Sequence, residues 1–439
     1  MPSDEVARDT IAAIATPAGR GAIGVIRISG PAVPSIAGRL LGLLPEPRRA
    51  TLASFRNARG EREDEGIALY FPAPQSYTGE AVLELHGHGG PIVLQSVLRA
   101  CLDAGARLAE PGEFTQRAFL EGKLDLAQAE AVADLIDASS REAARSALRS
   151  LGGEFSSAIG ALRSQLIDLR ALTEALLDFP EEEVDAVHRD DAGARLRALK
   201  LQLGEVLAKS RQGSLLRTGI HVVLAGRPNV GKSSLLNRLA GEERAIVTPV
   251  AGTTRDALRE PIQIEGVPLV LVDTAGLRAS MDMVEQLGIE RTRHELERAD
   301  LVLLVQEAGE PEALANLADG VQHIDVYNKA DLVPGFRPPR GALAVSAKTG
   351  QGLEALRVAI LSAAGWSATG ESVFLARERH LRALERARVH LDEAGGQLPR
   401  WELFAEELRL AQVALGGITG EFSADDLLGE IFSRFCIGK

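Results

Sequence analysis

Apolar and polar positions follow two different periods along this 439-residue chain. In residues 1 to about 120, short apolar runs at 22–28, 66–71 and 80–85 are separated by glycine and proline. Short apolar runs with such boundaries are typical of β-strands. The pattern predicts a small α+β domain over residues 1–120.

From about Lys123 to Gly213 the apolar positions recur every three or four residues, the spacing of one face of an α-helix. The clearest series is Leu148, Leu151, Phe155, Ile159, Leu162, Leu166 and Leu169. We expect the pair Gly152-Gly153 to loosen or kink this helix. The helical spacing returns near the end of the chain, at Leu381, Leu384, Leu391, Trp401, Leu408, Leu415, Leu427, Leu428, Ile431 and Phe435.

The segment between the two helical stretches has the strand–loop–helix order of an α/β domain. We therefore expect a multidomain protein in which an α/β domain at 218–370 is inserted into an α-helical bundle. The two halves of that bundle would be residues 121–217 and 371–439.

One loop in the α/β segment has the chemistry of a phosphate site. The apolar run 220–225 leads into Gly-Arg-Pro-Asn-Val-Gly-Lys-Ser at 226–233, and a helical stretch follows at 234–239. Small residues let successive backbone N–H groups converge on phosphate oxygens at a helix N-terminus. In this pattern Lys232 would neutralise the β- and γ-phosphates and Ser233 would hold Mg²⁺. A chance glycine-rich turn is the alternative, and the flanking strand and helix argue against it.

Three further segments follow in the order found in GTP-binding domains, so they indicate that the predicted nucleotide site binds GTP. Asp273 to Gly276 form an Asp-x-x-Gly element after an apolar run. Asn328, Lys329 and Asp331 belong to an Asn-Lys-x-Asp element, whose aspartate accepts hydrogen bonds from guanine N1–H and N2–H₂. Buried polar complementarity of this kind can reject the wrong ligand by about 10⁴–10⁵-fold. The last segment, which would close over the base, is Ser346, Ala347 and Lys348.

Composition limits the other classes of function. The chain has 49 basic and 61 acidic residues, a net charge of −12, which argues against nonspecific coating of nucleic acid. Its two cysteines are no disulfide framework. No apolar run of about 18 residues and no signal-peptide pattern occurs, so we expect a cytoplasmic protein with no membrane span.

With these motifs in view, the chain resembles the tRNA modification GTPase family called MnmE or TrmE over essentially its whole length. The resemblance is carried by the segments 9–21, 27–30, 76–80, 87–90, 111–114 and 123–130, and by the final Phe-Cys-Ile-Gly-Lys at 435–439. The N-terminal segments and the final one separate this family from other GTPases.

The resemblance implies a GTPase that works as a homodimer with an FAD-binding partner, MnmG. Together they install an aminomethyl-type group at C5 of the wobble uridine of certain tRNAs, and either glycine or ammonium could be the amine. It also implies that the N-terminal domain mediates dimerisation and binds 5-formyltetrahydrofolate or a related tetrahydrofolate. By position, the folate pocket would be lined by Arg27, Glu84, Lys123 and Lys439. Ordinary solvated surface charges are the alternative for Arg27 and Glu84.

The resemblance also assigns roles around the nucleotide. Leu277 stands where many GTPases carry a water-orienting glutamine, and the family's catalytic glutamate matches Glu285. An ordinary solvated glutamate is the alternative. A K⁺ ion, bound when two GTPase domains meet face to face, would replace an arginine finger, and its ligands would be Asn229, Thr248, Val250 and Thr253. Thr254 would bind Mg²⁺ with Ser233. The remaining GTP contacts would be Asn229, Val230, Gly231, Ser234, Thr248, Thr253 and Thr254.

Two features stay open. Cys436 could act as a nucleophile toward uridine C6, or it could be a buried, inert thiol. His86 and His88 are too few for a metal site and fit better in a glycine-rich turn near the folate. The rival function is a ribosome-assembly or signalling GTPase that modifies nothing. Such a protein would be expected to carry a basic RNA-binding module or a second GTPase domain, and neither is evident.

Overall fold

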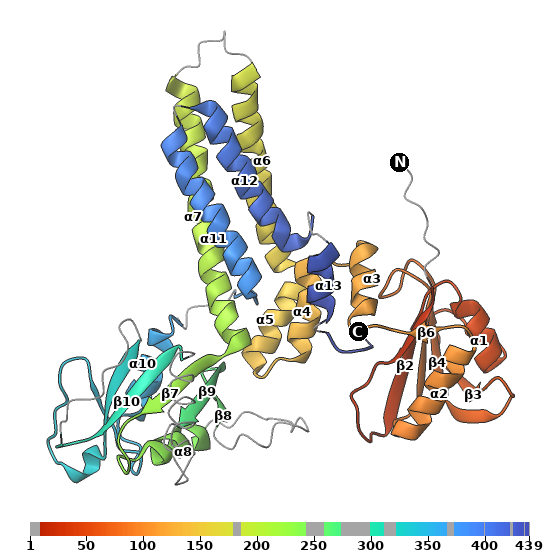
Figure 1. Cartoon of the computed structure of the whole chain (residues 1–439), viewed down its shortest axis with the longest axis horizontal. Helices are drawn as coiled ribbons and strands as arrows, with labels where there is room; N and C mark the ends of the chain where they lie inside the picture. The colour runs from red at the N-terminus through yellow and green to blue at the C-terminus, as the bar shows by residue number, and fades with distance from the viewer. Residues whose placement is uncertain are drawn as a thin grey trace, which may run out of the picture. The chain divides into compact units, whose positions relative to one another are not determined.

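The computed structural model describes residues 9–178, 186–242, 259–273, 299–310, 322–366, 373–398, 400–421, 425–433 and 435–438 (Figure 1). The chain forms two compact units, one of Met1–Ala133 with Gly416–Lys439 and one of Asp134–Leu415. It passes from one unit to the other within α4 (Leu126–Ile136) and again within α12 (Trp401–Thr419).

The first unit is built on a six-stranded sheet in the order β3-β4-β5-β2-β1-β6. Its strands are β1 (Ile11–Ile14), β2 (Ile23–Ser29), β3 (Thr51–Arg56), β4 (Arg62–Phe71), β5 (Val82–His88) and β6 (Arg107–Leu108). Helices α1 (Val33–Leu41) and α2 (Pro91–Asp103) pack on one face. Alternation in β2 sends Ile26 and Ile28 into that core and leaves Arg27 for the opposite face. The predicted α+β character is confirmed.

The C-terminal residues complete this first unit. Helix α13 (Asp425–Ser433) contributes Leu428 and Ile431 to an apolar cluster with Leu126 and Ala129 of α4. Phe119 of α3 (Glu113–Leu120) packs at the edge of the cluster. Beyond α13, Gly438 lies so close to the last residue of β1 that any Cβ placed on it would collide with the carbonyl oxygen of Ile14. Gly438 is therefore packed into the N-terminal fold.

The helical part of the second unit consists of α5 (Arg141–Leu151), α6 (Glu154–Asp178), α7 (Ala186–Thr218), α11 (Glu378–Gln397) and most of α12. Figure 1 shows α6, α7, α11 and α12 running side by side. The predicted single helix over 148–169 is in fact two helices. Gly153 has a φ of 86°, so the chain turns there and α6 begins with a new phase. Phe155 and Ile159 are buried as expected, whereas Leu148 is 54% exposed.

The remainder of the second unit is an α/β fold inserted between α7 and α11. Its sheet has the order β12-β11-β10-β7-β9-β8, and only β8 is antiparallel to its neighbour. The strands are β7 (Ile220–Ala225), β8 (Arg259–Ile264), β9 (Val267–Asp273), β10 (Leu301–Glu307), β11 (His323–Asn328) and β12 (Leu343–Ala344). Helices α8 (Lys232–Glu242) and α10 (Leu353–Ala363) follow β7 and β12.

Parallel strands place all their carboxyl ends at one edge of the sheet, the usual ligand edge of an α/β fold. The predicted strands at 220–225 and 323–327 lie in this sheet, and each leads into its motif at that edge. Among the described helices, none is both long enough and apolar enough to cross a bilayer.

Candidate functional site: a nucleotide cradle and a polar pair on the N-terminal sheet

The loop after β7 takes its shape from two glycines. Gly226 has a φ of 152° and Gly231 a φ of 92°. A Cβ on Gly226 would collide with the carbonyl oxygen of Val305, and a Cβ on Gly231 would collide with Nδ2 of Asn328. The loop therefore closes on its neighbours only because these two residues lack a side chain.

Lys232, the first residue of α8, lies over this loop. Its Nζ donates hydrogen bonds of 2.7 Å to the carbonyl oxygens of Gly226 and Arg227. The residue is 4% exposed. The loop carbonyls thus hold a buried cation at the N-terminal end of a helix, where anions are favoured by the backbone N–H groups and the helix dipole.

Asn328, at the end of β11, joins two of the predicted motifs. Its Nδ2 donates to the carbonyl oxygen of Val230 at 2.9 Å, and its Oδ1 accepts from the backbone N–H of Ala347 at 3.1 Å. The side chain is buried. One amide therefore fixes the distance between the phosphate loop and the Ser-Ala-Lys loop.

Asp331 and Ser346 form the next link in the same cradle. The hydroxyl of Ser346 donates to Oδ1 of Asp331 at 2.6 Å and accepts from the N–H of Thr349. Lys329, with a φ of 61°, is held by an ion pair of 2.6 Å to Glu307 at the end of β10. The sequence motifs do not indicate this role of Glu307, although the apolar run that precedes it could have located β10.

The structure thus brings together the predicted GTP contacts Asn229, Val230, Gly231, Lys232, Ser233, Ser234, Asn328, Lys329, Asp331, Ser346, Ala347 and Lys348 at the carboxyl edge of one sheet. Asp273 is the last residue of β9, which places its backbone at the same edge. The side chain of Asp273 and the residues Thr248, Val250, Thr253, Thr254, Gly276 and Glu285 lie outside the described residues.

A second polar site lies on the N-terminal sheet, on the face opposite α1 and α2. Arg27 of β2 and Glu84 of β5 are direct cross-strand partners, and their side chains form a salt bridge of 2.9 Å. The guanidinium of Arg27 also lies over the rings of Tyr77 and Phe114, 5.4 and 5.8 Å from their centroids. Nε2 of His86 lies 3.2 Å from the second oxygen of Glu84.

The other residues predicted for this second site are placed less completely. Lys123 is exposed and passes the loop that carries Tyr77, since a Cβ on Gly79 would lie 3.5 Å from Cε of Lys123. Lys439 lies outside the described residues, but its neighbour Gly438 contacts Ile14 on the strand next to β2.

The two cysteines have different surroundings. Cys101 is buried in α2, and burial raises the pKa of its thiol to about 12, so it is an inert core residue. Cys436 is exposed beyond α13, so the buried alternative for this residue is wrong. His86 and His88 lie on strand β5 and not in a turn. His88 pairs with Asp64, and the described part of the chain contains no cluster of three or more metal-ligating side chains.

Family models and relatives of known name match nearly the whole chain. The family model described as "GTP-binding protein TrmE N-terminus" matches residues 10–123, and "MnmE helical domain" matches residues 126–436. The chain is similar to proteins named tRNA modification GTPase MnmE from Azoarcus sp., with 62% identity, and Dechloromonas aromatica, with 60% identity. The matches cover 98% of this chain, and 98% and 99% of those proteins. A solved G domain of the T. maritima FeoB iron transporter matches 33% of this chain and 98% of its own length, with 26% identity and a TM-score of 0.25.

Proposed function

Because this chain belongs to the tRNA modification GTPase MnmE family, we propose that it hydrolyses GTP in the modification of tRNA. With an FAD-dependent partner of the MnmG type, it would form the (carboxymethyl)aminomethyl group at C5 of the wobble uridine. It would act as a homodimer in the cytoplasm.

The observation that carries the GTP part is the linked cradle of Asn328, Asp331 and Ser346. Asn328 joins the phosphate loop to the Ser-Ala-Lys loop, and Ser346 orients the carboxylate of Asp331. A preoriented carboxylate in the short 3-10 helix after β11 (Ala330–Leu332) is suited to the two adjacent donors of guanine. Adenine offers no such pair, so its binding would leave buried polar groups unpaired.

The proposed binding of Mg²⁺ and K⁺ is supported by single residues of the phosphate loop. Ser233 follows Lys232 in the first turn of α8, as a hydroxyl ligand of Mg²⁺ at a phosphate loop should. Asn229 is an exposed residue with a φ of 68° at the tip of the loop, so its carbonyl-type oxygen is accessible to a K⁺ ion. Bound there, K⁺ would supply the positive charge that an arginine finger supplies elsewhere. Thr254, as the second Mg²⁺ ligand, and Thr248, Val250 and Thr253, as further K⁺ ligands, remain part of this proposal, as does catalysis by Glu285.

We propose that the polar pair on the N-terminal sheet binds a tetrahydrofolate such as 5-formyltetrahydrofolate. Arg27 and Glu84 offer a cation and a carboxylate side by side, and the rings of Tyr77 and Phe114 lie against the cation. A pterin ring presents amide-like donors that a carboxylate can accept, and aromatic side chains provide flat apolar walls. Lys123 and Lys439 would attract the glutamyl tail.

The rival function, a switch GTPase without modifying activity, makes a different prediction in cells. Deleting the gene should remove the C5 modification of wobble uridine, and the protein should copurify with an FAD-binding partner. Nucleoside analysis of bulk tRNA measures the first outcome, and a plasmid copy carrying Asp331→Asn should fail to restore it. A deletion strain whose wobble uridine keeps its C5 modification would favour the switch GTPase.

A further inference from the structure

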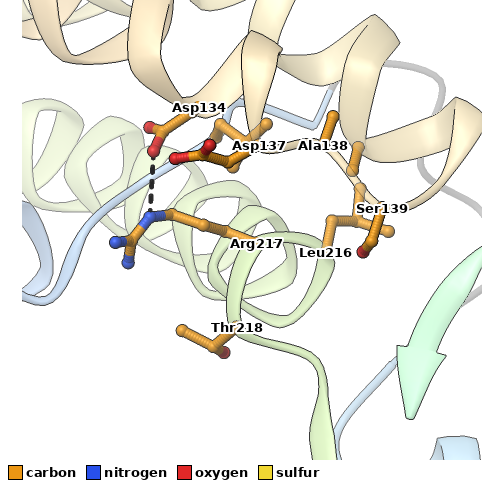
Figure 2. A pocket seen from close by; sticks show the side chains of 9 residues that line it. Asp134, Asp137, Ala138, Ser139, Leu216, Arg217 and Thr218 are labelled. Carbon is orange, nitrogen blue, oxygen red and sulfur yellow. Dashed lines mark hydrogen bonds and ion pairs between the residues drawn. The ribbon is translucent and has the colours of Figure 1, made fainter. Parts of the chain in front are cut away.

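The two segments that connect the helices to the inserted α/β fold each carry an arginine, and both arginines bind the carboxylate of Asp134. Arg217, in the last turn of α7, donates from Nε to Oδ1 of Asp134 at 3.1 Å, as Figure 2 shows. Arg377, directly before α11, donates from Nη2 to the same oxygen at 2.9 Å. Asp134 is 9% exposed. Removing either arginine would leave a poorly paired, largely buried charge, so this arrangement holds both crossings together.

The returning segment is also fixed along its backbone. Ser150 of α5 accepts a hydrogen bond of 3.1 Å from the N–H of Leu375. Gly213 of α7 lies so close to Phe374 that any Cβ there would collide with the Phe374 carbonyl oxygen. Both crossings are therefore anchored to the helices, and they act as a reference point for the α/β fold.

An α/β fold anchored only at its two crossings could still rotate relative to the helices. A third contact fixes its orientation. That contact comes from the β8–β9 hairpin. Gln263 of β8 donates from Nε2 to the carbonyl oxygen of Ser139 at 2.6 Å, in the turn between α4 and α5. At the hairpin tip Gly266, with a φ of 79°, lies directly against the carboxylate of Glu142 in the first turn of α5.

The same hairpin lies at one edge of the sheet. Strand β8 is an edge strand, paired only with β9, so it can shift without breaking the central parallel ladder. Strand β9 ends at Asp273 of the Asp-x-x-Gly element, and in the sequence β8 follows the segment that holds Thr254, the second predicted Mg²⁺ ligand. Its position is therefore tied directly to the nucleotide site.

The surroundings leave room for a second arrangement. A cavity of about 160 Å³ lies beside the Gln263–Ser139 contact, and its lining includes Asp134, Ser139, Ala143 and Leu216. In Figure 2 Asp137, Ala138 and Ser139 border it from the turn before α5, opposite Leu216 and Arg217 of α7. Closely packed interfaces resist small displacements, whereas a void lets side chains repack between discrete states.

We propose that the β8–β9 hairpin transmits the state of the nucleotide to the helical bundle through Gln263 and Ser139, against a reference point fixed by Asp134. Ser140, next to Ser139, caps α5: its Oγ accepts from the N–H of Ala143 and its carbonyl oxygen from the N–H of Ala144. A displacement of Ser139 would loosen or tighten this cap. Gln263 and Asp134 are positioning residues, and the inference rests on the proposed GTP binding.

Hydrogen–deuterium exchange of the full-length protein tests this inference, in GDP and in a non-hydrolysable GTP analogue. Exchange at Ala143 and Ala144 should differ between the two nucleotides, whereas exchange at Leu375 should not. In Gln263→Glu a carboxylate faces the Ser139 carbonyl, and the nucleotide-dependent difference at Ala143 and Ala144 should be lost. A merely structural role would change exchange equally in both nucleotide states.

Gln322→Glu is the matched control, because Gln322 is exposed in the same fold and, among the described residues, its hydrogen bond uses the backbone carbonyl. It should behave as the unmodified protein does, and both variants should keep their GTP affinity, measured separately. In Asp134→Asn the difference should spread to Leu375. Equal nucleotide dependence at Ala143 in Gln263→Glu and the unmodified protein would overturn the inference while leaving GTP binding intact. A protein that binds no GTP would overturn the proposed function as well.

Discussion

At the scale of single residues, the phosphate loop depends on the missing side chain of Gly231. We predict that Gly231→Ala weakens GTP binding by about tenfold or more, since a left-handed conformation costs an alanine about 1–2 kcal/mol even before the contact with Asn328. Isothermal titration with GTP measures this loss. Gly241→Ala is the control, because a Cβ on Gly241 of α8 would meet none of the described residues within 4 Å, and this variant should bind GTP normally.

Asp331 should decide which base is accepted. In Asp331→Asn an amide donor would face the guanine donors, and each buried group left unpaired costs about 1–3 kcal/mol. GTP affinity should therefore fall, and xanthosine triphosphate, which offers an acceptor at that position, should bind better. Competition binding with the two nucleotides measures the change in preference. Asp325→Asn, on the same β11 strand, should leave GTP preferred; unchanged GTP affinity in Asp331→Asn would contradict the assignment.

That the predicted motifs meet at one edge of the sheet could be foreseen, because each motif lies directly after an apolar strand run. The ties between motifs could not. Asn328 was expected to belong to the guanine motif, but its bond to the Val230 carbonyl depends on β11 and β7 lying on either side of β10. The Lys329–Glu307 pair depends on the same strand order. Neither relation is visible in local sequence, since both join residues far apart in the chain.

At the scale of elements, a glycine decided whether the apolar pattern from Leu148 to Leu169 formed one helix or two. The spacing from Leu148 to Leu169 fitted one helix, and a kink was expected at Gly152-Gly153. The left-handed conformation of Gly153 instead ends α5, so residues before and after it no longer share a face. A periodic pattern shows which residues are apolar, but not whether a glycine pair bends a helix or ends it.

Helix α3 is held by an ion-pair network that should make the first unit sensitive to acid. Burial raises the pKa of Glu113, but hydrogen bonds from Arg107 and Arg117 outweigh it and hold the pKa below its ordinary value. A carboxylate with a lowered pKa stabilises the folded state above its unfolded pKa, and this contribution is lost as the pH falls through the folded pKa. Stability of this unit should therefore decline below about pH 5.

The measurement is the amide protection of β1 across this pH range, corrected for intrinsic exchange. Glu113→Gln should lower protection at neutral pH and flatten its dependence on acid. Glu110→Gln is the control, since the Glu110 side chain is exposed and Glu110 contacts Glu113 through its backbone N–H and carbonyl oxygen. If the protection of β1 fell equally steeply with pH in Glu113→Gln and in the unmodified protein, groups other than Glu113 would be the cause.

At the scale of the whole molecule, hydrolysis should depend on two copies and one cation. We predict that GTP hydrolysis is much faster in K⁺ than in Na⁺, because a fixed ion would supply the charge of an arginine finger. Asn229→Ala should erase the difference, whereas Glu285→Ala should slow hydrolysis and spare nucleotide binding. Steady-state phosphate release in the two salts measures both effects. Equal rates in K⁺ and Na⁺ would remove the ion from the site.

The last residues of the chain should matter to folate and not to GTP. Gly438 lies against β1, next to the strand that carries Arg27. Deleting Ile437, Gly438 and Lys439 should weaken binding of 5-formyltetrahydrofolate and abolish tRNA modification, while basal GTP hydrolysis survives. Arg27→Ala should likewise lose folate binding and tRNA modification but keep GTP hydrolysis. Arg59 is exposed on the β3–β4 turn, and Arg59→Ala should keep folate binding and tRNA modification. Calorimetric titration measures the folate affinity; an intact protein that binds no folate would remove this site from the proposal.

The double pairing of Asp134 has a consequence for how such a chain can be assembled from parts. Because Arg217 and Arg377 reach the same oxygen, the polypeptide leaves the helices and returns to them within the span of two side chains. Inserted domains are tolerated where their two ends lie close together. The gene could therefore lose the whole nucleotide-binding cassette, joined by a few residues, and still encode a continuous helical scaffold. By the same geometry, a foreign domain with adjacent termini could be grafted in its place.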